Sequence, residues 1–417
     1  MNTQKQNFEI IFKYDPYEGQ ERPLPNHFTA VISHGDADGI VSAALMSKTL
    51  SRLHQPHIVL ISMDPTQTMT DTMLTEALHN APFGITHYNI VVCDRDIASP
   101  FIIAHNQVYN VIWCDHHKTS IEKYETVKDS YNTLSIKTFV TKDPTESAAT
   151  VVLRASHQIL CNDILEFKSD IELNPIDISV MTSPMQRWAK ITALWDTFTW
   201  KKGPNEEAHI SQLDINKAVT LSKASYILPA GMLFDLVVRE EFDDCYPNLE
   251  FAASIYQYRL DKAIEEAIEK SQRFNLFDKG DFNLTMIGGL VTTDVPSTYI
   301  SLFADHVFET NSDIDYVVVI SNGLVSTRVR QACSLDTSAV MKALGSICGF
   351  SGGGHPKAAG CKYKELPQVQ SNETPTEDVF YIMDKITSII KDTVGYECTG
   401  MDWGKEFRNL DGENNDR

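Results

Sequence analysis

The chain has 417 residues, of which 42% are hydrophobic and 22% charged, as in an ordinary globular protein of about two or three domains. Its formal net charge of −20 excludes a protein that holds long nucleic acid through a general basic surface. No stretch approaches the ~20 apolar residues of a membrane helix, and Met1–Gln20 lacks the apolar segment of a secretory signal, so we expect a cytoplasmic protein.

The cysteines exclude two further classes of protein. The eight of them are scattered, without a Cys-x-x-Cys pair: Cys93, Cys114, Cys161, Cys245, Cys333, Cys348, Cys361 and Cys398. This spacing fits neither a zinc site nor a disulfide framework. We expect free thiols in a reducing compartment.

The N-terminal part alternates apolar runs with helical patterns, which is typical of βαβ units and a mostly parallel sheet. One short strand is predicted around Phe8–Phe12, followed by strands at Phe28–Ser33, Ile58–Met63, Tyr88–Cys93 and Tyr109–Cys114. The predicted helices between them are Gly39–Leu53, a segment from Asp64 to Asn80, and one near Pro100–His105.

The middle of the chain is mainly helical, and a second α/β pattern follows it. The predicted helices are Thr145–Leu160, Pro184–Trp195, Ile215–Ser225, Met232–Glu241 and a connecting helix at Asn248–Arg273. The second pattern has strands at Thr285–Thr293, Asp315–Ile320 and Leu324–Val329, and helices at Pro296–Glu309, Asp336–Ile347 and Thr376–Asp392. We therefore predict an N-terminal α/β domain over residues 1–247, a connecting helix over 248–274, a smaller α/β domain over 275–397 and a flexible acidic tail over 398–417.

Three predicted strands end in Asp and His residues, which are the candidates for chemistry. They are His34, Asp36 and Asp38 after the first of these strands, Asp94 and Asp96 after the third, and Asp115, His116 and His117 after the fourth. The carboxyl ends of parallel strands meet at one edge of a sheet, where ligands bind. Acids gathered there are unfavourable unless cations bind. The alternative for each residue is a helix cap, an exposed turn or a surface histidine.

The spacing of Asp36 and Asp38 favours a shared cavity. Residues two apart in an extended segment point the same way, and Gly35 and Gly39 leave the backbone room. The alternatives are an exposed turn and a fragment of a calcium loop, although Ile40–Ala44 lacks the later ligands of such a loop.

The types of the candidate ligands indicate the metal. Carboxylates and imidazoles without thiolate favour Mn²⁺ or Mg²⁺ over structural zinc, with Co²⁺ or Fe²⁺ as alternatives. The number of acids indicates two ions, about 3.5–4 Å apart, as in enzymes that cleave phosphate esters. A further acid, Asp196, follows an apolar helical stretch, and its spacing alone fits a helix cap better than a ligand.

In the second domain, a glycine-rich segment is the outstanding feature. Gly352, Gly353 and Gly354 offer exposed backbone N–H groups as an anion nest does, with His355 and Lys357 as further donors. The alternative is a flexible hairpin. On the preceding strand, Ser326, Arg328 and Arg330 share one face, and one arginine is expected to reach a phosphate, while an exposed strand face explains them equally well.

The segments HGDADG, CDRD, WCDHHKTS and ALWDTF, followed by GGGHPKAAG, resemble the motifs of the DHH phosphoesterase superfamily in content and order. More narrowly, the chain is similar to the branch that carries a DHH-associated C-terminal domain. That branch includes RecJ-type exonucleases, nanoRNases and cyclic-dinucleotide phosphodiesterases. The resemblance extends from Phe28 to Ala359 and implies two α/β domains that face each other across an active-site cleft.

The resemblance also implies a role for each candidate residue. The ligands of two Mn²⁺ ions would be His34 and Asp36 for the first, Asp38, His116 and Asp196 for the second, and Asp94 as a bridge between them. Asp115 would orient the site and His117 would lie near the substrate. The residues that hold the nucleotide and its terminal phosphate would be Ser326, Arg328, Gly352, Gly353, Gly354 and His355.

Together with the strong negative charge, the resemblance predicts a Mn²⁺-dependent phosphodiesterase that hydrolyses short oligonucleotides or linear dinucleotides, such as pGpG or pApA, to mononucleotides. The alternatives are a RecJ-like single-strand exonuclease, a phosphoadenosine-phosphate phosphatase and a non-catalytic nucleotide-binding protein. We expect neither a membrane partner nor stable binding to long nucleic acid. The oligomeric state stays open, with a homodimer as one alternative.

Overall fold

The computed structural model describes residues 8–15, 27–63, 67–81, 85, 87–97, 109–117, 120–122, 136–143, 145–161, 175–239, 242–278, 285–293, 295, 299–321, 323–364, 376–394 and 396–399. The chain divides into two compact units, Met1–Tyr256 and Gln257–Arg417. Each unit is built around its own sheet. Within the described residues, no helix is both long enough and apolar enough to span a membrane.

The first unit contains a six-stranded sheet in the order β1-β3-β2-β4-β5-β6. The strands are β1 (Glu9–Tyr14), β2 (His27–His34), β3 (His57–Ser62), β4 (His87–Cys93), β5 (Tyr109–Asp115) and β6 (Ile136–Val140). All neighbours pair in parallel except β1, which pairs antiparallel with β3. The prediction of a mostly parallel sheet is therefore confirmed.

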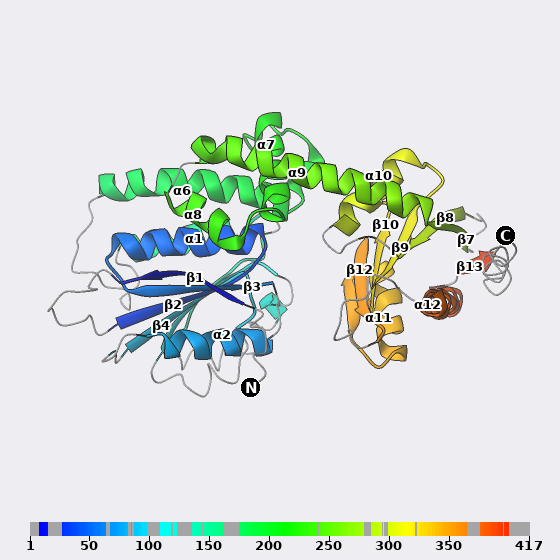
Figure 1. Cartoon of the computed structure of the whole chain (residues 1–417), viewed down its shortest axis with the longest axis horizontal. Helices are drawn as coiled ribbons and strands as arrows, with labels where there is room; N and C mark the ends of the chain where they lie inside the picture. The colour runs from blue at the N-terminus through cyan, green and yellow to red at the C-terminus, as the bar shows by residue number, and fades with distance from the viewer. Residues whose placement is uncertain are drawn as a thin grey trace, which may run out of the picture. The chain divides into compact units, whose positions relative to one another are not determined.

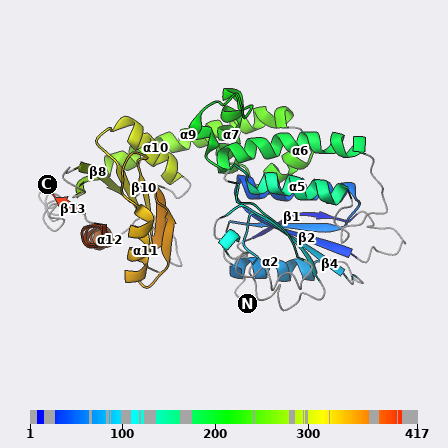
Figure 2. The ribbon, with the colours of Figure 1, turned by 180° about the vertical axis from the view of Figure 1, so that it is seen from behind.

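Helices cover both faces of this sheet, as Figures 1 and 2 show. One face carries α1 (Ala37–Arg52), α5 (Ala148–Leu160) and α6 (Pro175–Asp196), and the other carries α2 (Gln67–His79). Successive strand residues point to opposite faces, so Val31 packs with α1 and Ile32 packs with α2. Because both faces are covered, the central strands are mainly apolar on both sides.

Helix α1 is buried between the sheet and a layer of further helices, and small residues such as Ala43, Ala44 and Ser47 allow this close packing on both sides. Asp36 caps the helix by accepting a hydrogen bond from the Gly39 N–H at 2.9 Å. The helix packs against the sheet on one side and against α5, α6 and α8 (Ala230–Arg239) on the other. The remaining elements of the unit are η2 (Thr199–Lys202) and α7 (Gln212–Ser225), and the long helix α9 (Phe242–Glu269) spans the division between the units.

The second unit contains a seven-stranded sheet in the order β11-β12-β10-β9-β8-β7-β13. Its strands are β7 (Gln272–Asp278), β8 (Thr285–Thr292), β9 (Tyr316–Ser321), β10 (Leu324–Val329), β11 (Gly352–His355), β12 (Ala358–Lys362) and β13 (Tyr396–Thr399). Among these described strands, the pairing is parallel between β8 and β9 and antiparallel elsewhere. The helices are α10 (Ile300–Thr310), α11 (Thr337–Ile347), α12 (Thr376–Ile389) and the π-helical turn η4 (Ile390–Val394). Apolar residues of α11 and α12 form one core with the sheet.

Two helices begin earlier in the structure than the sequence predicts. The prediction begins one helix at a proline and the other just after a proline, whereas both helices contain that proline in their interior. Helix α6 passes through Pro184, and α9 begins at Phe242, with Pro247 in its second turn. Cys398 and Thr399, which the predicted boundaries place in the tail, pair with β7 as part of β13. The predicted helix near Pro100–His105 and residues 400–417 lie outside the described residues.

The glycine-rich segment forms a hairpin, as the alternative interpretation of the sequence has it, because Gly352–His355 is strand β11 and pairs antiparallel with β12. A Cβ on Gly352 would lie 2.1 Å from the Met341 carbonyl oxygen, so only glycine lets this strand approach α11. Gly353 has a φ of 149°, which side-chain-bearing residues rarely adopt. The glycines permit close packing and an unusual backbone within a hairpin.

Candidate metal centre

The parallel register of the first sheet brings the predicted Asp and His residues to one edge. Strands β2, β4 and β5 end level with one another, since Ser33 pairs with Cys93 and Cys93 pairs with Cys114. Eight side chains gather at or near these ends, and we call them the Asp–His cluster: His34, Asp36, Asp38, Asp94, Asp115, His116, His117 and Asp196. Asp196 comes from the last residue of α6 rather than from a strand.

The first group of ligand atoms surrounds one side of Asp94. The Nδ1 atom of His34 lies 2.9 Å from Asp36 Oδ2 and 3.8 Å from Asp94 Oδ2. The Nε2 atom of the same ring lies 3.2 Å from the Met63 carbonyl oxygen, so a proton on Nε2 leaves Nδ1 free to bind a metal. These three residues have one ligand atom each within 4.8 Å of one another, as a shared cation requires.

A second group meets at His116. Its Nε2 atom lies 3.1 Å from Asp196 Oδ2, 3.8 Å from Asp38 Oδ2 and 3.7 Å from Asp94 Oδ1. Asp94 thus presents one carboxylate oxygen to each group. Its backbone at a φ of 55° turns the chain directly after β4, a conformation that Asp tolerates better than most residues do.

Asp38 has a structural role beside its place in the cluster. Its carboxylate accepts hydrogen bonds from Ser147 Oγ at 2.9 Å, from the Ala148 N–H at 2.7 Å and from the Ala149 N–H at 3.0 Å. It therefore caps α5 across the fold, in place of the Ser147 side chain, which makes no cap of its own. Ser147 was not among the predicted site residues, although a Ser before a helical pattern is a recognisable signal.

Asp115 orients both histidines from beneath the cluster. It is fully buried, and its Oδ1 accepts hydrogen bonds from the His116 N–H at 2.7 Å, the His117 N–H at 3.1 Å and His117 Nδ1 at 2.8 Å. Its Oδ2 accepts one from Ser120 Oγ at 2.5 Å. Both oxygens are thus engaged by the protein, which suits a residue that holds others in place.

The centre of the cluster is electrostatically unsatisfied. Burial raises the pKa of Asp94 well above its ordinary value, and the carboxylates of Asp36 and Asp38 raise it further. Burial and Asp38 raise the pKa of Asp196 in the same way. Within the described part of the chain, neither oxygen of Asp94 has a hydrogen-bond partner, and Nε2 of His116 and Oδ2 of Asp196 lie 3.1 Å apart without forming a hydrogen bond. Buried polar atoms are rarely left so, and a divalent cation is the partner that this donor set fits.

The histidine His117 provides a pH test of this arrangement. The hydrogen bond from its ring to Asp115 raises the pKa of His117 to about 9. Because this value exceeds the ordinary 6.5, the protonated ring stabilises the metal-free fold fully below pH 6.5, and this stabilisation is lost as the pH rises to about 9. We expect Asp115→Asn to return the His117 pKa towards 6.5, measured by NMR titration of the metal-free protein. An unchanged pKa would show that Asp115 does not hold the proton on His117.

The fold of this structure resembles those of several known proteins. No protein-family model matches the chain, and no curated protein matches its sequence. The chain is similar to a solved DHH domain described as belonging to a family of ribosomal proteins, with 11% identity, a TM-score of 0.59, and coverage of 88% of this chain and 87% of that one. It is also similar to exonuclease RecJ bound to manganese, with 14% identity, a TM-score of 0.51, and coverage of 92% and 93%.

This chain has the DHH fold. A further similarity, to RecJ from Thermus thermophilus in complex with Mn²⁺, has 14% identity and a TM-score of 0.50, and covers 86% of this chain and 51% of that one. The resemblance drawn from the motifs is thereby confirmed at the level of the fold. The eight cluster residues meet within this DHH fold as the motif order predicts, including Asp196, which spacing alone would have left out.

In the second unit, four of the remaining predicted residues share one face of the sheet: Ser326, Arg328, Gly353 and His355. Gly352 and Gly354 pair with Cys361 and Ala359 on the other face. Ser326 and Gly353 both pair with Gly360, while Arg328 and His355 both pair with Ala358. Directly paired residues lie on the same face, so Arg328 and His355 flank the small side chain of Ala358. The opposite face, with Val325 and Cys361, packs against α11 and α12. The result is a half-exposed surface of small residues between an arginine and a histidine.

Arg328, within β10, and Arg330, directly after it, have different environments. Arg330 donates hydrogen bonds to Asp315 Oδ1 at 2.6 Å and to the carbonyl oxygens of Ile314 and Asn311 at 2.6 and 2.8 Å, so it is committed to the fold. Arg328 donates to the hydroxyl of Ser301 at 3.0 Å and to the Thr327 carbonyl oxygen at 2.8 Å. Among the described residues, no carboxylate accepts a hydrogen bond from Arg328, although the negative charge of Asp305 acts on its guanidinium. Arg328 is therefore less committed to the fold than Arg330 and better placed to bind an anion.

Proposed function

We propose that the chain is a metal-dependent phosphodiesterase that binds two Mn²⁺ ions in the Asp–His cluster and hydrolyses short oligonucleotides or linear dinucleotides, such as pGpG or pApA, to mononucleotides. The observation that carries this proposal is the shared position of Asp94, whose two unpartnered oxygens face one ligand group each. Two divalent ions held there would lower the pKa of a water and stabilise the charge that develops on the phosphoryl oxygens. The fold of RecJ, solved with manganese, supports the same assignment.

The protein's own residues supply orientation and a proton. Asp115 fixes the rings of His116 and His117 through its hydrogen bonds, so His116 Nε2 stays directed at Asp94 and Asp196. The raised pKa of His117, about 9, keeps its ring protonated at neutral pH. With about half of its side chain exposed, at 53%, His117 can donate a hydrogen bond to a substrate phosphate or a proton to the leaving oxygen.

The open sheet face of the second unit is proposed to hold the end of the substrate. Arg328 supplies a fork of donors for a terminal phosphate. His355 accepts a hydrogen bond from the Lys357 N–H at Nδ1, which leaves the proton of the neutral ring on Nε2 as a donor. Ser326 adds a hydroxyl on the same face, and Gly353, where an added Cβ would meet nothing within 4 Å, leaves space for the nucleotide beside it. Gly352 and Gly354 face the packed side of the hairpin.

The length of the substrate can be tested with a panel of pApA, pGpG and single-stranded oligomers up to about 20 nucleotides at one Mn²⁺ concentration. We expect kcat/KM to fall at least about tenfold from dinucleotide to the longest oligomer, because a chain of net charge −20 offers no general attraction to a long polyanion. Equal values across the panel would contradict the short-substrate proposal.

The second candidate is a RecJ-like single-strand exonuclease, which the likeness to RecJ over 92% of this chain favours. It predicts that binding of long strands weakens steeply with salt, whereas cleavage of dinucleotides responds little. Phosphoadenosine phosphate belongs in the same panel, since its preferred hydrolysis would identify a monoester phosphatase.

A further inference from the structure

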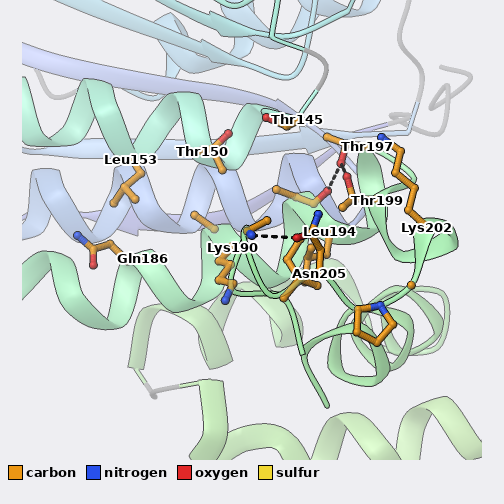
Figure 3. Close-up of a pocket in the computed structure, with 16 residues that line it drawn as sticks. Thr145, Thr150, Leu153, Gln186, Lys190, Leu194, Thr197, Thr199, Lys202 and Asn205 are labelled. Carbon is orange, nitrogen blue, oxygen red and sulfur yellow. Dashed lines mark hydrogen bonds between the residues drawn. The ribbon is translucent and has the colours of Figure 1, made fainter. Parts of the chain in front are cut away.

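The first unit contains a cavity that the proposed chemistry does not use. It has a volume of about 540 Å³ and lies between α5, α6 and the segment that follows η2, as Figure 3 shows. This volume falls within the range of about 300–1,000 Å³ that is typical of small-molecule sites. Its lining includes the aliphatic residues Leu153, Ala193, Leu194 and Ile210.

The charge of this cavity is opposite to that of the protein. The chain has 56 acidic and 36 basic residues, yet the described lining of the cavity includes Lys190 and Lys202 and no Asp or Glu. Lys190 donates hydrogen bonds to the His209 carbonyl oxygen at 2.8 Å and to Asp214 Oδ2 at 3.3 Å. Asp214 also accepts a hydrogen bond from Arg187 at 2.6 Å, and Arg187 lies 3.9 Å from Asp243 as well. The charged side chains of the described lining itself are both positive, which favours an anion.

The polar groups of the lining suit a ligand larger than phosphate. Thr197 and Thr199 bring their hydroxyls within 2.8 Å of each other, and Asn205 keeps its amide donors while its Oδ1 accepts from the Ala208 N–H at 3.1 Å. Lys202 is exposed and forms no ion pair or hydrogen bond with another described residue. Aliphatic walls with a few hydroxyl and amide groups fit a nucleobase and ribose, and a free ammonium at the rim fits a phosphate.

Two walls of the cavity are attached to the metal centre. Thr197 follows Asp196 directly, and Thr145 precedes Ser147, whose hydroxyl donates to Asp38. A ligand in the cavity would therefore contact segments that hold two of the cluster carboxylates. This connection to the metal centre distinguishes the cavity from an isolated surface pocket.

We propose that this cavity is a subsite for a nucleoside monophosphate, with the base and ribose against the aliphatic walls and the phosphate at Lys202. The inference rests on the proposed function, because a phosphodiesterase that releases mononucleotides supplies this ligand as part of its substrate or as free product.

The test is calorimetric binding of AMP and GMP to the full chain in EDTA, with Arg328→Ala as the background. Chelation removes metal-mediated binding and the background removes binding at the second unit, so the remaining signal reports the cavity. We expect Lys202→Glu to weaken AMP or GMP binding by about tenfold. The matched control is Lys201→Glu, which changes the net charge equally but does not line the cavity, and we expect less than about a twofold loss.

Absence of nucleotide binding in that background would overturn the proposal, as would equal losses in the two lysine variants. Because the measurement contains no metal and no turnover, a failure of the proposed hydrolysis leaves its result readable. Kinetics on pApA then identify the source of the ligand. A KM raised about tenfold in Lys202→Glu assigns the cavity to the substrate, whereas an unchanged KM with a lost response to added AMP assigns it to free nucleotide.

Discussion

Replacement of Asp94 by Asn will remove hydrolysis and yet make the metal-free protein more stable. Both carboxylate oxygens of Asp94 are buried without a hydrogen-bond partner among the described residues, close to the carboxylates of Asp36 and Asp38. Burial beside these carboxylates disfavours the ionised form of Asp94, and a neutral amide removes that cost, so the free energy of unfolding should rise by about 1–3 kcal/mol. The same oxygens are the proposed bridge between two ions, so kcat/KM should fall at least about 10³-fold.

The experiment compares melting temperatures of wild type and Asp94→Asn with EDTA and with Mn²⁺. In EDTA the variant should melt higher, and with Mn²⁺ only the wild type should gain much stability, since a ligand that binds the native state stabilises it by mass action. Asp115→Asn is the matched control, because this equally buried carboxylate accepts four hydrogen bonds. It should melt lower than wild type in EDTA. A lower melting temperature for metal-free Asp94→Asn would show that the protein itself compensates this charge.

The sequence predicts the cluster well because parallel strands align their ends. Once β2, β4 and β5 are identified by their apolar runs, adjacent pairing in register places His34, Asp94 and His116 together without further information. Asp196 is different, since the end of a helix 80 residues along the chain from His116 can be placed only by packing or by a known motif. The structure supplies that packing through the contact of α6 with α1 and α5.

The glycine segment shows where local reasoning fails. Three consecutive glycines have low strand propensity, and on their own they indicate a loop. Here the close approach of α11 at Gly352 and the pairing with β12 outweigh that preference. Strand β10 shows a related limit of prediction from sequence. Alternation of side chains along the strand predicts that Ser326, Arg328 and Arg330 share one face. It does not reveal that Arg330 donates hydrogen bonds to Asp315 and to two carbonyl oxygens.

That difference between the arginines leads to opposite expectations for Arg328→Ala and Arg330→Ala. Arg328 donates only to a hydroxyl and one carbonyl oxygen among the described residues, so its loss should change the melting temperature little. Without the fork of donors, KM for pApA should rise about 100-fold, because charge-assisted contacts to a phosphate are strong and bidentate. The preference for pApA over the unphosphorylated dinucleotide ApA should disappear at the same time.

Arg330→Ala should have the converse effect. It leaves the carboxylate of Asp315 and the carbonyl oxygens of Ile314 and Asn311 without their donor, so the free energy of unfolding should fall by about 2 kcal/mol or more. KM for pApA should stay near the wild-type value at a temperature where the variant is folded. If instead both variants lose the preference for a terminal phosphate, the anion is held by the whole face of β10 and Arg328 has no special part in it. Arg328→Lys refines the result, since a lysine that restores affinity indicates a need for charge alone, whereas continued loss indicates a need for the planar guanidinium.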